Sequence, residues 1–303
     1  WMQVHTFSPI IDGGTRGFVS GGAHPGTNAI EYITISIGGN ASDFGDLAST
    51  NKYCSGGSSN TRGIIGGGEE GGATDRIQYH SLSSTGNTTD FGNLAASQTY
   101  IAGCSNQTRL VWGGGKDSSN NKNNIMTYVT IASTGDSKDF GDITQVRSNI
   151  GALSNPTRGL FAGGYTPTQV NTIDYITIAS TGNAQDFGDI SNGIGTNSAQ
   201  CASTTRGIIW GGYPAGTNID FLTIATLGHT TDFGESTINL SYRNCTSDCV
   251  RGISFGGQDG PGARNTIEYI TISTTGDATD FGDLATDQHH AAASYSTGHG
   301  GLG

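Results

Sequence analysis

The sequence is poor in charged residues and above all in lysine. Asp, Glu, Lys and Arg make up 13% of its 303 residues, and lysine occurs only at Lys52, Lys116, Lys122 and Lys138. A surface that follows nucleic-acid phosphates needs clustered Lys and Arg. The net charge is −11 and the sequence contains no such cluster, so nucleic-acid binding is not expected.

Long apolar runs and paired metal ligands are also missing. No stretch approaches the roughly 18 apolar residues of a membrane-spanning helix, so no membrane insertion is expected. None of the five cysteines forms a Cys-x-x-Cys pair, which disfavours zinc. Cys245 and Cys249 could meet across a tight turn, but small buried thiols are the favoured interpretation. Neither a metal nor a cofactor is expected.

The residues that dominate instead are those of short strands and tight turns. The chain has 50 glycines and is rich in Thr, Ile, Ser and Asn, whereas strong helix formers are rare. This composition predicts an all-β protein, and the length is sufficient to bury a large core.

The sequence is a six-fold repeat. An arginine recurs at steps of 46, 47, 49, 48 and 45 residues, and an Asp-Phe-Gly mark recurs equally often. The arginines are Arg16, Arg62, Arg109, Arg158, Arg206 and Arg251, and the aspartates are Asp43, Asp90, Asp139, Asp186, Asp232 and Asp280. A repeat of about 40–50 residues is typical of β-propeller blades.

Each repeat divides into four expected strands. The first is a small-residue run such as "YIAGCSNQ" (100–107), and the second follows "TRG" and ends at a glycine pair, as in "TRGIIGGG" (61–68). The third alternates, as in "TIDYITIAS" (172–180), and a "TGN" or "TGD" turn leads to the fourth, "DFGDL", whose Phe points inward. Because one such sheet cannot bury its apolar faces alone, we predict a six-bladed propeller of four-stranded antiparallel blades over residues 15–297.

The chain also contains a spare first strand that would close the ring. Residues 289–297 are expected to complete the blade that begins at Thr15, with residues 5–12 as the alternative. Residues 1–14 are expected to be a lead-in that continues from an upstream segment, and residues 298–303 a flexible or separate Gly-rich tail. An open β-solenoid is the alternative fold, because the period alone does not require closure.

The repeated arginines and aspartates suggest a structural latch. An Arg at the start of each second strand could reach the Asp that opens the fourth strand, and their equal numbers favour such pairs over an anion-binding ring of arginines. The spacing of Asp136, Asp139 and Asp142 allows a calcium hypothesis. Calcium loops usually alternate ligands at every second residue, so turn and strand-start hydrogen bonds are the favoured interpretation.

The connections between strands predict two different faces. The "TRG" and "STGN" turns are nearly constant and define a uniform face, whereas the connections from second to third strand differ in every repeat and define a variable face. The variable loops are residues 23–28, 69–75, 116–124, 165–171, 213–218 and 258–265. Binding tends to reside on loops of a rigid scaffold, so the variable face is the predicted recognition surface.

Seven residues of the variable loops are the predicted ligand-binding residues. They are Tyr165, Tyr213, Glu69, Glu70, Asp117, Asp259 and His24. Aromatic rings can stack on sugar faces while carboxylates accept hydrogen bonds from hydroxyl groups. Trp210 and Phe255 replace smaller residues four positions after the repeat arginine, and core filling is favoured for them over lining the channel mouth.

An enzymatic activity is not expected. The seven histidines form no recognisable arrangement with a Ser or Cys nucleophile, and no Gly-x-Ser-x-Gly elbow is present. A glycosidase-type pair of carboxylates stays open because Asp and Glu are numerous. A polysaccharide-cleaving enzyme is therefore kept as an alternative.

The repeat resembles that of kelch-type propellers. The glycine pair that ends the second strand, such as Gly67-Gly68, is similar to the kelch double glycine, and Tyr175 and its counterparts stand where kelch repeats carry Tyr. Phe187 and its counterparts stand where kelch repeats usually place Trp, which is a departure from the kelch pattern.

The wording "NTIDYITIASTGNAQDFGDI" (171–190) more closely resembles repeats of tail-fibre and other virion-surface proteins of marine bacteriophages, over roughly residues 15–297. The resemblance implies a non-enzymatic, extracellular role at the virion surface. It implies a host surface glycan or receptor and other virion proteins as partners, and it is compatible with a homo-oligomer. A virion decoration or assembly protein without a ligand is the alternative.

Overall fold

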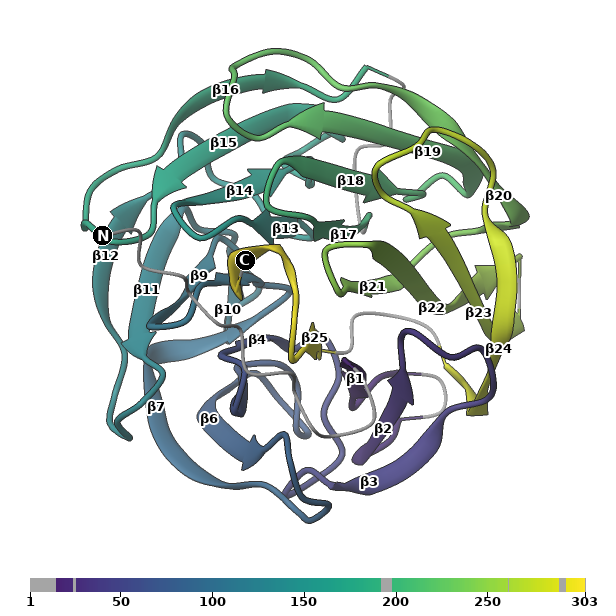
Figure 1. The fold of residues 1–303 in the computed structure, drawn as a ribbon. Helices are drawn as coiled ribbons and strands as arrows, with labels where there is room; N and C mark the ends of the chain where they lie inside the picture. The colour runs from purple at the N-terminus through teal and green to yellow at the C-terminus, as the bar shows by residue number, and fades with distance from the viewer. Residues whose placement is uncertain (1–14, 24–25, 192–197, 261, 289–292, 303) are drawn as a thin grey trace, which may run out of the picture.

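The protein is a six-bladed β-propeller. The computed structural model describes residues 15–23, 26–191, 198–260, 262–288 and 293–302, and its six antiparallel sheets stand around a common axis (Figure 1), which confirms the predicted fold. Within these ranges the only helical element is a 3₁₀ turn, η1 (Gly300–Leu302). No helix of the described chain is long and apolar enough to cross a membrane.

Each blade has its first strand nearest the axis and its fourth strand at the rim (Figure 1). Blade 1 contains β25 (Ala293–Ser296), β1 (Arg16–Ser20), β2 (Ala29–Thr34) and β3 (Ser42–Asp46). Blade 2 contains β4 (Ser55–Ser58), β5 (Arg62–Gly66), β6 (Thr74–Ser81) and β7 (Thr89–Thr99), and blade 3 contains β8 (Ala102–Ser105), β9 (Arg109–Gly113), β11 (Ile125–Thr130) and β12 (Lys138–Asp142).

The other three blades follow the same order. Blade 4 contains β13 (Gly151–Ser154), β14 (Arg158–Ala162), β15 (Thr172–Thr177) and β16 (Gln185–Asp189), and blade 5 contains β17 (Ala199–Ala202), β18 (Arg206–Trp210), β19 (Gly216–Thr223) and β20 (Thr231–Leu240). Blade 6 contains β21 (Asn244–Ser247), β22 (Arg251–Asp259), β23 (Gly262–Thr271) and β24 (Thr279–Gln288). A short extra strand, β10 (Lys116–Asp117), leaves the blade 3 loop and pairs with β7 of blade 2.

The ring closes through its C-terminal strand, as predicted. β25 pairs antiparallel with β1, so that Tyr295 lies opposite Phe18 with the two rings stacked at 5.6 Å. The Tyr295 hydroxyl is hydrogen-bonded to Ser20 Oγ at 2.6 Å and to His80 Nε2 at 2.7 Å, which links blades 1 and 2. The first residues of the predicted closing segment, 289–292, and the alternative segment 5–12 lie outside the described residues.

The Phe of each Asp-Phe-Gly mark is the extra residue of a β-bulge. In blade 1, Ile30 pairs with Gly45 and Glu31 pairs with Asp43, which leaves Phe44 unpaired and turned into the core. The same shift occurs in every blade, and the six phenylalanines are at most 6% exposed, as predicted for this position.

The repeated "STG" turn holds neighbouring blades together through a set of contacts that we call the turn clasp. Between blades 3 and 4, Gly182 N donates to Phe140 O at 2.7 Å and Ala184 N donates to Asp142 O at 2.8 Å. Asp142 N in turn donates to Asn183 Oδ1 at 3.1 Å. Equivalent bonds occur at all six interfaces, with Asn40, Asn87, Asp136, Asn183, His229 or Asp277 as the side-chain acceptor.

The turn clasp confirms the hydrogen-bonding interpretation of Asp136, whose carboxylate accepts from Asn93 N at 2.9 Å. It also explains the glycine in the fourth strand. A Cβ on Gly141 would lie 2.6 Å from the Gly182 carbonyl group of the next blade, so only glycine permits this close approach.

The predicted pairing of the repeat arginines with the fourth-strand aspartates is wrong. Arg158 instead donates to Ile224 O of the next blade at 2.8 Å, and its guanidinium lies 4.9 Å from the centre of the Tyr175 ring. The arginines of the other blades do the same, with the carbonyl groups of Leu82, Ile131, Ile178, Ile272 and Ile35 as acceptors.

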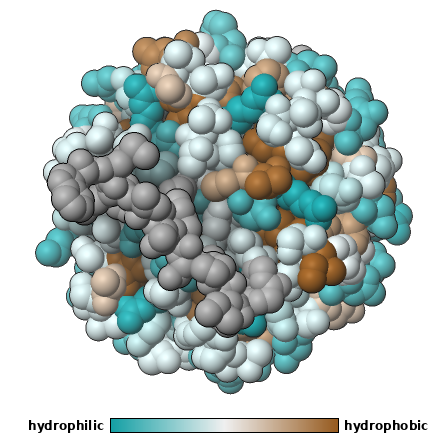
Figure 2. All heavy atoms as spheres, in the orientation of Figure 1, coloured by the Kyte–Doolittle hydropathy of each residue, from teal (hydrophilic) through white to brown (hydrophobic). Residues whose placement is uncertain are grey.

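The aspartates lie too far out to reach those arginines. The six residues Asp43, Asp90, Asp139, Asp186, Asp232 and Asp280 are exposed on the outermost strands. Hydrophilic side chains are accordingly distributed around the whole rim (Figure 2). Each arginine extends toward the next blade, where a backbone carbonyl group just after the third strand accepts its hydrogen bond. The arginines therefore join neighbouring blades, and the aspartates stay in solvent.

The Gly-rich tail is not a flexible or separate element, as its composition had suggested. Gly300 and Gly301 of η1 are buried against the ends of the first strands, and a Cβ on Gly301 would lie 1.9 Å from Ser105 O. His299 Nε2 is 3.1 Å from Ser58 O, and Gly301 N donates to His299 Nδ1 at 3.1 Å. The segment therefore fills the channel on the uniform face, where the first strands end.

Gly141→Ala should destabilise the protein more than Gly182→Ala, as measured by urea unfolding. Both glycines have a positive φ, of 136° and 153° respectively, so both variants carry a backbone cost of about 1–3 kcal/mol. A Cβ at position 182 meets nothing within 4 Å, whereas one at 141 collides with the clasp and adds about 1–3 kcal/mol. Equal effects would show that the close glycine contact does not stabilise the interface.

Stability should fall as the pH drops from 7 to 5. Burial lowers the pKa of His80 and of His299 to about 4, below the ordinary value of 6.5. Above pH 6.5 both are neutral whether folded or unfolded, whereas between 6.5 and 4 only the unfolded chain takes up protons. Each histidine then removes about 2 kcal/mol by pH 5. His299→Gln should flatten the pH profile of the free energy of unfolding, as measured by urea denaturation at each pH.

Candidate functional site

The variable loops and the starts of the first strands meet at one end of the channel. The second strand runs antiparallel to the first, so the loop that follows it returns to the segment before the first strand. In blade 4, Tyr165 N donates to Ser148 O at 2.8 Å. Glu69 pairs in the same way with Lys52 in blade 2, and Gln258 with Ser241 in blade 6. The candidate surface therefore consists of the loops together with these lead-in segments.

The two loop tyrosines are placed as predicted, on the surface. Tyr165 is 40% and Tyr213 50% exposed, and their loops are joined by a hydrogen bond of 2.8 Å from Gln169 Nε2 to Tyr213 O. The Tyr213 ring also stacks on that of Tyr242 at 5.8 Å. Blades 4, 5 and 6 thus share one aromatic surface.

The predicted acidic ligand residues are engaged within their own loops. Glu69 is 3.4 Å from Lys52, Glu70 is 3.4 Å from Arg76, and Asp259 is 2.5 Å from Arg264. Asp117 Oδ1 accepts from Ser119 N and Asn121 N, both at 2.8 Å. These bonds organise the loops, which a sequence pattern alone does not reveal. His24 lies outside the described residues.

Three further tyrosines surround the channel mouth, and the sequence analysis missed them. Tyr53, Tyr100 and Tyr242, the mouth tyrosines, each stand nine residues before a repeat arginine, and Asn149 occupies the same place in blade 4. All four have φ between 57° and 59°, which residues other than glycine rarely adopt. This backbone costs about 1 kcal/mol or more per residue and is typical of positions where function constrains the chain. Aligning the repeats nine residues upstream of the arginine would have revealed them.

The mouth tyrosines pack on one another. The Tyr53 and Tyr100 rings stack at 4.1 Å with an interplanar angle of 16°. Burial, followed by the hydrogen bond with Tyr53, raises the pKa of Tyr100, and burial also raises the pKa of Tyr242, with Tyr213 and Tyr53 as further causes. These hydroxyls stay protonated at neutral pH and can donate or accept hydrogen bonds.

A cavity of about 100 Å³ lies next to the mouth tyrosines, along the axis of the propeller. Tyr100 and Tyr242 line it together with Gln200 and Asn244. Gln200 is 8% exposed and donates its Nε2 to Ala162 O and Ser198 Oγ, while its Oε1 has no hydrogen-bond partner. This oxygen is itself enclosed by the protein, so it is not exposed to a molecule in the cavity.

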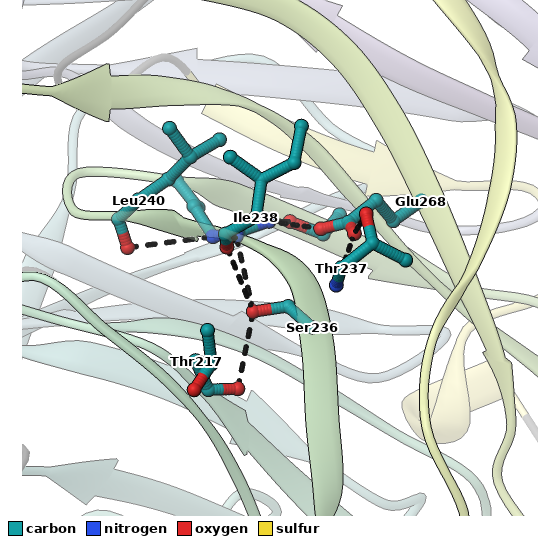
Figure 3. A network of polar contacts seen from close by, with 8 residues as sticks. Thr217, Ser236, Thr237, Ile238, Leu240 and Glu268 are labelled. Atoms are coloured by element: carbon teal, nitrogen blue, oxygen red, sulfur yellow. Dashed lines mark hydrogen bonds and ion pairs between the residues drawn. The ribbon is translucent and has the colours of Figure 1, made fainter.

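Two buried ion pairs fix the lead-in segments. Arg243, before β21, donates to Glu268 Oε2 of β23 at 2.5 Å and to Ile238 O of blade 5 at 2.5 Å. Figure 3 shows the surrounding network, in which Thr237 N donates to Glu268 Oε1 at 2.7 Å. The repeat pattern does not point to Arg243 or Arg147, because neither stands at the repeat position.

The second pair joins blade 4 to the segment that leaves blade 3. Arg147 and Asp174 are completely buried, 2.6 Å apart, and Asp174 Oδ1 accepts from Thr144 Oγ1 at 2.6 Å. Arg147 also donates to Gly163 O at 2.7 Å. Removing one partner of such a pair is strongly destabilising, because the other charge is then buried without its counter-charge.

The remaining candidates belong to the core. Trp210 and Phe255 are at most 1% exposed, which confirms core filling. All five cysteines are free, so Cys245 and Cys249 are not bonded, and burial raises the pKa of Cys54 and Cys104 to about 12. These thiols are therefore protonated and poorly nucleophilic at neutral pH. Within the described ranges no group of three or more His, Cys, Asp or Glu could hold a metal ion.

Comparison with known proteins gave no family: no family model matches the chain, and no curated protein matches it.

Asp174→Asn should lower the free energy of unfolding by about 3 kcal/mol, because it leaves the buried Arg147 without its counter-charge. Asp186→Asn is the matched control: Asp186 lies opposite Asp174 in the same sheet but is exposed, so it should change stability by less than about 0.5 kcal/mol. Urea denaturation of the two variants checks this. A large effect at Asp186 would instead support the predicted pairing of the repeat arginines with the fourth-strand aspartates.

Proposed function

We propose that the protein is a non-enzymatic recognition module that binds a surface glycan or protein through its variable face. The observation that carries this proposal is that the two faces differ in how their connecting segments are used. The uniform turns are occupied by the turn clasp at all six interfaces, whereas the variable loops present Tyr165 and Tyr213 to solvent. Among the described residues, exposed aromatic rings are found on the variable face, where a rigid scaffold holds them.

The chemistry of this face suits a carbohydrate better than a reaction. Tyrosine rings offer flat apolar surfaces for sugar faces, and their hydroxyl groups can donate or accept hydrogen bonds. Burial keeps the Cys54 and Cys104 thiols protonated, His80 is buried against Tyr295, and His299 lies at the opposite end of the channel. These observations support binding without catalysis.

We further propose that the module is the head of a bacteriophage tail fibre or spike, located at the virion surface and associated with other virion proteins. The resemblance of its repeat sequence to the repeats of such proteins supports this assignment. In that setting the ligand is a glycan or receptor on the host surface, and sequence variation would concentrate on the variable loops.

Tyr165→Ala combined with Tyr213→Ala should weaken binding to host cells or to a glycan array about tenfold or more, since each ring contributes about 1 kcal/mol. Ile37→Ala combined with Leu227→Ala is the control, because these side chains are 63% and 58% exposed but lie in the turns of the uniform face. Unchanged binding by the tyrosine variant, at unchanged thermal stability, would refute the proposed surface.

A further inference from the structure

Two of the four lysines lie side by side on the variable face. Lys116 and Lys122 stand opposite each other in an antiparallel bridge of the loop between β9 and β11. Within the described part of the chain neither ammonium group has an ion-pair partner, although the net charge of the chain is −11. Like charges placed directly opposite each other in a sheet repel, so this arrangement is costly unless something compensates for it.

The backbone fixes the two lysines in this position. Asp117 accepts from the N–H groups of Ser119 and Asn121, which closes the hairpin, and Asn120 takes the left-handed conformation at its tip. Lys116 also pairs in register with Thr99 of β7, so the hairpin is anchored to blade 2. The lysine pair is therefore built by the loop and is not drawn together by a carboxylate of the chain.

Each ammonium lies over a tyrosine ring. Lys116 Nζ is 4.6 Å from the centre of the Tyr100 ring, and Lys122 Nζ is 4.6 Å from that of Tyr165. Tyr100 lines the axial cavity and Tyr165 is one of the exposed loop tyrosines, so the lysine pair connects the two parts of the candidate surface. The ring contacts attract the cations but leave their N–H donors without an anionic acceptor.

The bridge is consistent with the electrostatics of Lys116: burial, followed by the nearby charge of Lys122, lowers the pKa of its ammonium group. A bound anion would favour the charged form and so oppose both effects. Glu69, an acidic residue near Tyr100, is already paired with Lys52.

We propose that Lys116 and Lys122 bind the carboxylate of an acidic sugar whose ring contacts Tyr165 and whose hydroxyl groups reach the channel mouth. This inference rests on the proposed function and deepens it by naming the ligand class. A carboxylate can place one oxygen before each ammonium. Its single negative charge is opposed less by the acidic chain than the two charges of a phosphate would be.

The test is a saccharide array with three matched arms: glycans that carry uronic or sialic acid, the same glycans with the carboxylate reduced to an alcohol, and sugar phosphates. The strongest binding is expected in the first arm, with a loss of about tenfold or more on reduction. Raising the salt concentration should weaken this binding, because the pair is partly exposed. Lys116→Gln combined with Lys122→Gln should abolish the preference for the acid while keeping the side-chain stems.

Lys138→Gln, an exposed lysine of β12 on the rim, is the matched control and should bind like the parent protein. Equal binding of acidic and reduced glycans, or an unchanged preference in the lysine variant, would overturn the inference. Binding that still depends on Tyr165 and Tyr213 would leave the proposed function standing. A response to sugar phosphates alone would refute the carboxylate. If no saccharide binds in a tyrosine-dependent way, the glycan form of the proposed function fails as well.

Discussion

The architecture depends on the contact between the "STG" turn of one blade and the fourth strand of the blade before it. Gly182 N bonds to Phe140 O while the two backbones approach too closely for any side chain at Gly141. A single blade cannot bury both of its faces, so the fold exists only when six such contacts form at once. This accounts for the repetition of the "STG" turn and the Asp-Phe-Gly strand in the sequence, because each copy of the turn docks on the fourth strand of the neighbouring blade.

That constraint divides the molecule into a part that must be uniform and a part that is free to vary. The turns, the repeat arginines and the C-terminal segment at His299 are all used to hold the ring. At the opposite end of the channel, the backbone at Tyr53, Tyr100 and Tyr242 has a positive φ, which costs conformational free energy. A rigid ring can sustain that cost, and recognition is the function for which such preorganised aromatic rings are suited.

The sequence predicted what a repeat makes visible and failed where contacts cross between repeats. Blade number, strand order, the inward Phe and the closing strand followed from spacing and alternation. The partner of Arg158 did not, since repetition shows that a residue has a constant role but not which neighbouring blade supplies the other half. The tail at Gly300 and Gly301 was misjudged for a related reason: glycine indicates flexibility when exposed, but close packing when buried.

The residues that break the six-fold pattern are the ones that carry individual properties. Arg147 and Arg243 occur in only two blades, and each fixes one lead-in segment beneath the variable face. Among the variable loops, only residues 116–124 contain lysine, and there Lys116 and Lys122 stand opposite each other. A symmetric scaffold would need none of these, and buried charges or opposed lysines would only lower its stability. Their position at one end of the channel supports the proposal that this end is the binding surface.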